Sequence, residues 1–271
     1  MLPSADPSAA SRISYACYDH RSRTGEQFVP HHVFSYQLAG QSTVSDGDQT
    51  HRFTAGSFRL IRRNHLFKFT KQPPAGGGEF RTVAVCLGQS LLRALSQEYG
   101  FQAGSSRPER SILPLAPHPL YQSYFDSLQP YQQLAQPAQA LLQDLKVREA
   151  ALVLLQGTPA LRDVLFDFRE PGKIDLAAFM EKNFRFNVAL SRFAYLTGRS
   201  LATFKRDFTQ LFQQPPSRWL VQRRLREAHF LLKERGLTPS DVYLEVGFED
   251  LSHFSYAFKK AYGLAPSRLA G

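Results

Sequence analysis

The sequence predicts an α+β protein of two domains: a β-rich domain with appended helices over residues 1–170 and an all-helical domain over residues 171–271. Two patterns predict this class. Short apolar segments separated by turn residues fill residues 32–87, and from about residue 88 the apolar residues recur at helical spacing. Pro171-Gly172 then breaks the chain, which sets the expected domain boundary. A length of 271 residues suits two domains of ordinary size.

Six strands are expected in the first domain. Asp46-Gly47-Asp48 is a strong hairpin signal between two of them, and short strands at this spacing favour a sandwich or a small barrel. The expected strands are His32–Leu38, Gln41–Ser45, Thr50–Phe53, Ser57–Ile61, Leu66–Thr70 and Phe80–Leu87.

Three helices are expected to follow the strands, at Ser90–Tyr99, Leu120–Leu128 and Ala138–Gln156. The last carries an apolar stripe at helical spacing. The stripe either packs against the β-rich domain or forms a dimer interface. Its members are Leu141, Leu142, Leu145, Ala151, Leu152 and Leu155.

Residues 171–271 are expected to form a compact all-α domain of short helices with short connections. The predicted helices are Asp175–Asn183, Ala189–Leu196, Ser200–Phe212, Ser217–Glu234, Ser240–Val246 and Asp250–Tyr262.

The charge is concentrated in the second domain. The chain has a net charge of +10, and residues 172–271 contribute +7 of it, from 16 Lys and Arg against 9 Asp and Glu. A basic surplus favours a polyanionic partner.

Membrane insertion and secretion are not expected. No apolar run approaches the length of about 20 residues needed to cross a bilayer, and the N-terminus has neither a basic leader nor an apolar core. Cys17 and Cys86 are too few for a disulfide scaffold. These features predict a cytoplasmic protein without a membrane partner.

The helical domain contains an internal repeat at an offset of 50 residues. In each copy a short helix leads through a turn with Gly198 or Gly247 to a longer helix that Ser200 or Asp250 can cap. This layout is the helix-turn-helix, whose second helix enters the major groove of DNA. The paired positions include Phe204 and Phe254, Phe208 and Phe258, Phe212 and Tyr262, and Pro216-Ser217-Arg218 and Pro266-Ser267-Arg268.

The aromatic face of each long helix is expected to be core, and the opposite face to meet DNA. The joining helix Ser217–Glu234 would span about 27 Å, close to the 34 Å between successive major grooves. The candidate DNA-binding residues are Ser200, Ala202, Thr203, Lys205, Arg206, Thr209, Ser252, His253, Ser255, Tyr256, Lys259 and Lys260.

Residues 176–269 resemble the DNA-binding domain of the AraC/XylS family of bacterial transcriptional regulators. The most specific motif is the ending, with Gly247-Phe248, Phe254, Phe258-Lys259-Lys260, Gly263 and Pro266-Ser267. Arg199-Ser200-Leu201, Phe204-Lys205-Arg206, Trp219 and Arg224-Leu225 also match. The resemblance implies a regulator that binds promoter double-stranded DNA and influences RNA polymerase.

Residues 30–87 resemble, with less specific motifs, the cupin-like β-barrel that this family places before its DNA-binding domain. The motifs are Leu38-Ala39-Gly40, Phe53-x-Ala55-Gly56-Ser57 and Leu60-Ile61-Arg62-Arg63. The resemblance implies that residues 1–170 bind a small-molecule effector or form a homodimer. A constitutive DNA binder whose barrel only dimerises is the alternative within this class.

The two repeat units differ at family contact positions. Lys205 and Arg206 of the first unit correspond to Ser255 and Tyr256 of the second, which lack strong base-reading donors. Arg206 contacts a guanine, a phosphate or no part of the DNA, whereas Lys259 and Lys260 are expected to contact phosphates or to lie on the solvated surface rather than to read bases. We therefore expect sharper base preference under the first unit.

Catalysis, a metal site and a cofactor are not expected. A cupin-type enzyme is the rival class, but His31 and His32 are adjacent and point to opposite strand faces, and no Asp or Glu follows them until Asp46. One of His31, His32, His51 and His65 is more plausible in a structural or effector-pocket role. Arg62-Arg63 is either a solvated strand end or a site for an anionic effector or the partner domain.

Overall fold

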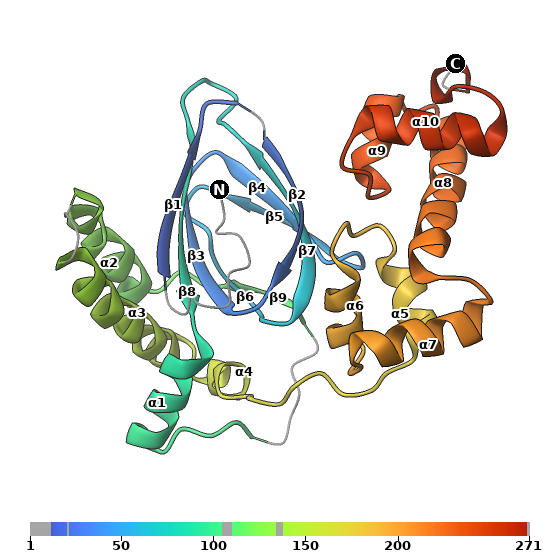
Figure 1. The fold of residues 1–271 in the computed structure, drawn as a ribbon. Coiled ribbons are helices and arrows are strands. Elements are labelled where there is room, and N and C mark those ends of the chain that lie inside the picture. The colour runs from blue at the N-terminus through green and yellow to red at the C-terminus, as the bar shows by residue number, and fades with distance from the viewer. Residues whose placement is uncertain (1–11, 21, 105–109, 134–137, 270–271) are drawn as a thin grey trace. The chain divides into compact units, whose positions relative to one another are not determined.

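The computed structural model describes residues 12–20, 22–104, 110–133 and 138–269, and it divides into two compact units (Figure 1). The first unit holds most of the chain up to Arg169, and the second holds the chain from Glu170 onward. Each unit is described by itself below.

The described strands of the first unit form two sheets (Figure 1). One has five strands in the order β1-β8-β3-β6-β9, and the other has four in the order β2-β7-β4-β5. The described strands therefore form two separate antiparallel sheets, as expected of a sandwich, and not the closed barrel that was the other expectation. The strands are β1 (Arg12–Tyr18), β2 (Ser22–Val29), β3 (His32–Ala39), β4 (Gln41–Ser45), β5 (Thr50–Thr54), β6 (Phe58–Ile61), β7 (His65–Gln72), β8 (Phe80–Leu87) and β9 (Ile112–Leu115).

The six predicted strands are confirmed within two residues at each end, whereas β1, β2 and β9 were not predicted. The expected hairpin joins β4 and β5, where the Asp46 carboxylate accepts hydrogen bonds from the backbone N–H groups of Asp48 (3.0 Å) and Gln49 (2.8 Å). β9 lies between the predicted helices Ser90–Tyr99 and Leu120–Leu128, where no strand was predicted. Its pairing with β6 supplies order that local sequence does not.

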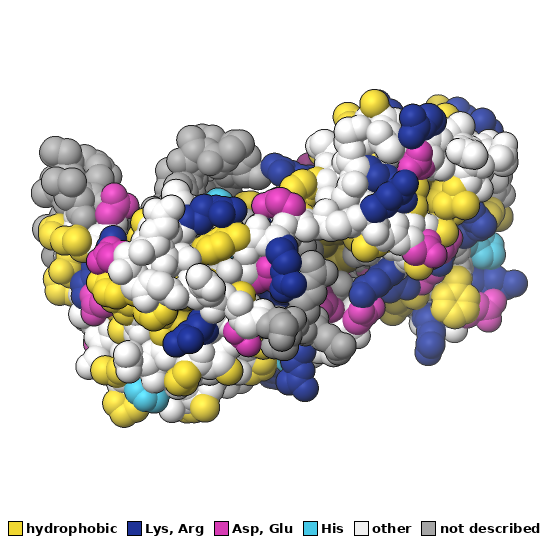
Figure 2. Space-filling model, turned by 90° about the horizontal axis from the view of Figure 1, so that it is seen from below, with side chains coloured by type: hydrophobic (Ala, Val, Ile, Leu, Met, Phe, Trp, Pro, Cys, Tyr) yellow, Lys and Arg dark blue, Asp and Glu magenta, His cyan; other side chains and the backbone are white. Residues whose placement is uncertain are grey.

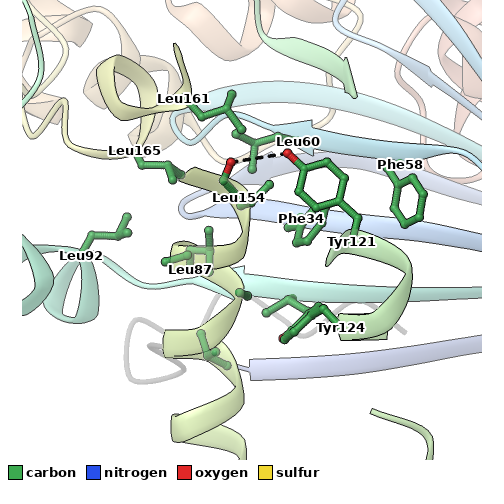
Figure 3. Close-up of a cluster of buried hydrophobic side chains, with 14 of the residues drawn as sticks. Phe34, Phe58, Leu60, Leu87, Leu92, Tyr121, Tyr124, Leu154, Leu161 and Leu165 are labelled. Atoms are coloured by element: carbon green, nitrogen blue, oxygen red, sulfur yellow. Dashed lines mark hydrogen bonds between the residues drawn. The ribbon is translucent and has the colours of Figure 1, made fainter. Parts of the chain in front are cut away.

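Helices pack on one face of the five-stranded sheet and build the main core of the unit. Phe34 and Phe58 from the sheet meet Tyr121 from α2, with ring centroids 5.3 and 5.6 Å apart, as the close-up in Figure 3 shows. The Tyr121 hydroxyl donates to the Leu154 carbonyl of α3 at 3.4 Å. The elements are α1 (Gln89–Tyr99), α2 (Pro119–Ser127), η1 (Gln129–Gln133), α3 (Ala138–Gly157), η2 (Pro159–Leu161) and α4 (Arg162–Leu165).

The buried face of α3 differs from the predicted stripe. Val147, Ala150, Ala151 and Leu154 are fully buried in this core, whereas Leu145 is 64% exposed. Of the predicted stripe, Ala151 is buried, Leu142, Leu152 and Leu155 are half-buried, and the Leu141 side chain lies outside the described ones. The sequence located the helix correctly, but the face that meets the sheet is rotated from the leucine-rich one.

From Glu170 onward the regular elements of the second unit are all helices, and the six predicted helices are confirmed within one residue at each end. Two apolar clusters lie along it, one around Phe204, Phe208 and Trp219 and the other around Phe254, Phe258 and Leu232. The elements are α5 (Leu176–Asn183), α6 (Leu190–Leu196), α7 (Leu201–Phe212), α8 (Pro216–Arg235), α9 (Pro239–Glu245), α10 (Leu251–Tyr262) and η3 (Pro266–Arg268). None of the described helices in either unit is long and apolar enough to cross a membrane.

Candidate nucleic-acid interface

Two helix-turn-helix units are formed by α6–α7 and α9–α10, and both expected N-caps are present. The Ser200 hydroxyl accepts from the Thr203 backbone N–H at 3.2 Å, and the Asp250 carboxylate accepts from the His253 N–H at 2.7 Å. These bonds satisfy donors that the first helical turn leaves unpaired. Each long helix therefore starts at a fixed residue.

The turns before these caps require glycine. Gly198 and Gly247 have φ values of +65° and +94°, and a Cβ atom on either would lie within 2.6 Å of backbone atoms of another segment. A left-handed backbone and close backbone approach are both disfavoured for residues with a side chain. The two turns are thus set by the same constraint at the two repeat positions.

The aromatic face of each long helix is buried, as the repeat predicts. Phe204 and Phe208 of α7 are fully buried, and Phe208 meets Trp219 of α8 with ring centroids 5.6 Å apart. Phe254 and Phe258 of α10 are fully buried in the same way, and Phe258 lies 6.3 Å from the His229 ring of α8. Burial of this face leaves the opposite face of each helix available for a partner.

Most of the candidate DNA-binding side chains lie on the available faces. Thr203 and Ser255 are half-buried, and the other ten are exposed: Ser200, Ala202, Lys205, Arg206, Thr209, Ser252, His253, Tyr256, Lys259 and Lys260. Ser200 is also occupied in the cap, since its hydroxyl donates to Thr203 Oγ1 at 3.0 Å. In the view of Figure 2, Lys and Arg side chains are spread over the molecular surface among hydrophobic ones.

Arg206 is a strongly exposed cation of α7, with 74% of its side chain accessible to solvent. Its Nη2 lies 3.2 Å from Asp207 Oδ1, and Arg199 Nε lies 3.2 Å from the other carboxylate oxygen. The hydrogen bond from Arg199, aided by Arg206, lowers the pKa of Asp207 below its usual range. Because Arg199 also binds Asp207, Arg206 can leave this carboxylate for DNA without leaving it unpaired.

The exposed face of α10 has a different chemistry. Tyr256 is 68% exposed near the middle of the helix, and Lys259 and Lys260 lie in its last turn before Gly263. Lysines at a helix C-terminus interact favourably with the helix dipole. α10 therefore offers an aromatic side chain and two charges where α7 offers Lys205 and Arg206.

Helix α8 joins the two helix-turn-helix units, and a buried arginine of α8 holds this helix to the α5–α6 link. Arg224 Nε and Nη2 donate to the carbonyl oxygens of Phe184 and Phe186, both at 2.8 Å, in the link between α5 and α6. Nearby, Arg223 Nε binds Glu181 of α5 at 2.8 Å. These bonds fix α8 to the first helix-turn-helix unit, and the 20 residues of α8 rise about 30 Å.

Two further basic residues at equivalent positions were not among the candidates. Arg218 and Arg268 are exposed, and each follows the buried proline of a Pro-Ser-Arg segment. The 50-residue repeat already paired these segments and could have identified both residues.

The structure corrects one expectation about the compact unit that contains the two sheets. Arg63 is neither a solvated strand end nor exposed to a ligand: it is buried, and its Nη2 donates to the carbonyl oxygens of Asp167 (3.1 Å) and Arg169 (2.8 Å). His32 is buried as well, and burial together with the Arg63 charge lowers its pKa to about 3. Within the described part of the chain, no three His, Cys, Asp or Glu residues are grouped so as to hold a metal ion.

Two family descriptions match the chain. Residues 32–164 match the ExsA N-terminal regulatory domain, and residues 193–270 match a helix-turn-helix domain.

Individual relatives match across most of the chain. The chain is 28% identical to the HTH-type transcriptional regulator ExsA of Pseudomonas aeruginosa, over 85% of this chain and 83% of that protein. It is 26% identical to the virulence regulon transcriptional activator VirF of Yersinia enterocolitica, over 85% of this chain and 86% of that protein. A solved structure of ToxT from Vibrio cholerae aligns with 97% of this chain and all of that chain, at 10% identity and a TM-score of 0.43. The chain belongs to the AraC/XylS family of transcriptional regulators.

Proposed function

We propose that this regulator binds double-stranded promoter DNA with α7 and α10 in successive major grooves. The observation that carries the proposal is the pair of capped helices 50 residues apart, each with a buried aromatic face and an exposed polar or basic face. The rise of about 30 Å along α8 is close to the 34 Å groove repeat. The two helices therefore suit neighbouring grooves on one side of the duplex.

The two helices are proposed to do unequal work. Lys205 and Arg206 lie in the N-terminal half of α7, the part of a recognition helix that usually reaches base edges. Lys259 and Lys260 lie at the end of α10, where phosphates are the nearer partners. Ala202, Thr203 and Thr209 complete the α7 surface, and Ser252, His253, Ser255 and Tyr256 complete that of α10. Ser200 would act at the same surface while capping α7, and Arg218 and Arg268 supply further phosphate contacts.

Residues 1–170 are proposed to form a regulatory domain of cupin-like type that responds to a small-molecule effector, and residues 171–271 the DNA-binding domain. The match to a regulatory domain and the two facing sheets support the first assignment. The exposed Leu145, with half-buried Leu142 and Leu152 on α3, supports a homodimer contact there. RNA polymerase is the further proposed partner, and the cytoplasm the proposed location. Relatives named as regulators support a role without catalysis.

Selection of bound sequences from random DNA with the full-length protein, at a stated salt concentration, tests the proposal. The expected result is one motif with two parts centred about one helical turn apart, the part under α7 being better defined. Binding that shows no sequence preference at any salt concentration would contradict it, because phosphate contacts alone carry no sequence information.

A further inference from the structure

Two cations lie buried between the two sheets of the first unit. Arg59 of β6 and Lys71 of β7 are 5% and 4% exposed. The Arg59 guanidinium lies over the Phe53 ring of the opposite sheet at 4.7 Å, and Lys71 Nζ lies 4.7 Å from the centre of the Tyr18 ring of β1. Both side chains therefore bridge the two sheets from the inside.

The sheet surface beside Arg59 is made of small residues. The strand registers align Ser14, Ala84, Ser35, Arg59 and Pro114 in one row across the five-stranded sheet. Phe58 and Leu60 point to the helix-covered face, so alternation directs Arg59 and this row toward the other sheet. The long Arg59 side chain thus lies in a row that offers little bulk around it.

Among the side chains that the structure describes, the guanidinium of Arg59 has no anionic partner. Its Nε and Nη1 atoms are buried and make no hydrogen bond. The sequences of β1 and of β3 to β9 contain no Asp or Glu, and Glu26 of β2 is the one acid in any strand. Other polar groups nearby are satisfied, since Gln37 Nε2 donates to the Ala39 carbonyl at 2.7 Å and Ser42 Oγ donates to Gln37 Oε1 at 3.0 Å. An uncompensated buried charge is strongly unfavourable and is usually paired.

The charges persist at neutral pH. Burial lowers the pKa of Arg59 to about 10, and burial together with repulsion from Arg59 lowers the pKa of Lys71 to about 8. Two cations in one interior, flanked by aromatic rings of Phe53, Tyr18 and Phe80, suit a ligand that combines an oxyanion with an apolar body.

We propose that the two sheets enclose a binding site for a small organic anion, whose carboxylate or phosphate group is held by Arg59 and Lys71. This inference rests on the proposed effector response and gives the effector its chemical class. Binding would supply the missing partner of Arg59 and so stabilise the first unit.

Thermal unfolding of the full-length protein tests the site with three probes: inorganic phosphate, butyrate and the neutral butyramide, at constant ionic strength set with sodium chloride. The expected result is a saturable rise in Tm of at least about 2 °C with one or both anions and none with butyramide. The anion that acts distinguishes a phosphate from a carboxylate ligand. No shift with either anion, or equal shifts with butyrate and butyramide, would overturn the proposal.

Three variants assign any shift to the two cations. Arg59→Met is expected to abolish the anion-dependent shift and to raise the Tm of the ligand-free protein, because it removes an unpaired buried charge. Arg81→Met, at an exposed arginine on β8 of the same sheet, is the matched control and should retain the shift. Lys71→Met is expected to weaken the anion affinity about tenfold. A shift that persists in Arg59→Met shows that the anion binds elsewhere.

Glu26→Gln tests whether Glu26 already neutralises Arg59. If it does, Glu26→Gln alone will lower the Tm, and adding Arg59→Met to Glu26→Gln will restore the lost Tm. That result would overturn the proposal.

DNA affinity measured with and without the active anion separates the inference from the function on which it rests. A DNA affinity that changes when the anion is added supports both the anion site and the proposed effector response. An anion that binds through Arg59 without changing DNA affinity leaves the site standing and removes the effector response. Specific DNA binding without any anion-dependent stabilisation contradicts the anion site and leaves the proposed DNA-binding function standing.

Discussion

Gly247 of the second helix-turn-helix unit lies against Arg185, in the α5–α6 link that leads into the first unit, so closely that a Cβ atom on Gly247 would come within 2.5 Å of the Arg185 carbonyl oxygen. The same Cβ would lie 3.0 Å from Arg224 Nε, whose guanidinium already binds two carbonyl groups beside Arg185. This contact between the α9–α10 turn and the α5–α6 link fixes one unit relative to the other. The relative placement of the recognition helices therefore depends on a residue with no side chain.

Gly247→Ala is expected to destabilise the protein by about 2 kcal/mol or more, through a positive φ and the contact with Arg185 together. Gly263→Ala is the matched control, because its φ is also positive (+76°) but no atom lies within 4 Å of the added Cβ. It should cost about 1 kcal/mol. Denaturant unfolding measures both. Equal losses in the two variants would show that the close contact yields without cost.

Arg206→Ala is expected to weaken binding to the selected DNA site by about 1–3 kcal/mol and to relax the preference at one base pair. The reason is its exposed place on α7, where the guanidinium can bind a guanine through two parallel hydrogen bonds. Binding measured on the selected site and on single-base variants tests this. An equal loss of affinity on every sequence would make Arg206 a phosphate contact instead.

Replacing Lys259 and Lys260 by Ala is expected to lower the slope of log K against log salt concentration by about 1 to 2 units. Each lysine that neutralises a phosphate displaces a bound counterion, and the two lie at the phosphate-facing end of α10 in the proposed complex. The preferred DNA sequence should stay the same. Titrations at several salt concentrations measure the slope, and an unchanged slope would remove these lysines from the interface.

A fragment of residues 171–271 is expected to fold and to bind DNA more weakly than the full chain. The physical reason is that, apart from Leu66 and Phe28, the two apolar clusters around Trp219 and Phe254 consist of residues from this part of the chain, whereas the proposed α3 dimer contact lies outside it. Circular dichroism and DNA titration measure the two properties. An unfolded fragment would contradict the proposed domain boundary, and affinity equal to that of the full chain would contradict the dimer.

Acidification is expected to destabilise the first unit through His32. Burial lowers its folded-state pKa to about 3, against about 6.5 when unfolded, so the unfolded chain binds the proton more readily between these values. The stability from neutral His32 is full above pH 6.5 and falls as the pH drops toward 3, by up to about 1.4 kcal/mol per pH unit. His32 Nδ1 also accepts from the Arg63 N–H at 3.4 Å, a bond that protonation removes.

Unfolding of full-length wild type and His32→Gln between pH 7 and pH 4 measures this dependence. The variant should lose the histidine contribution to the slope, whereas the half-exposed His51→Gln should retain it. Identical pH profiles for wild type and His32→Gln would show that His32 does not control acid stability.

Local sequence determined the elements whose signals are short in range. The apolar period, the caps Ser200 and Asp250, and the turn at Asp46-Gly47-Asp48 each act over a few residues, so α5 to α10 and the β4–β5 hairpin could be predicted. The repeat also placed Phe204 and Phe254 in the core and Arg206 and Lys259 on exposed faces.

Only the tertiary structure decided where those elements meet. β1, β2 and β9 depend on partners far along the chain, and the face that α3 buries depends on the sheet beneath it rather than on the number of leucines. Strand alternation could place the Arg59 side chain on the sheet face opposite to that of Phe58. Only the presence of the second sheet makes this face part of the interior. Likewise, Gly247 is recognisable as a turn residue, whereas its contact with Arg185 arises because α8 brings distant backbones together. The sequence specifies local conformation and which side chains share one face of a helix or strand. The packing of distant segments decides which charges become buried and how the two DNA-binding units are held relative to each other.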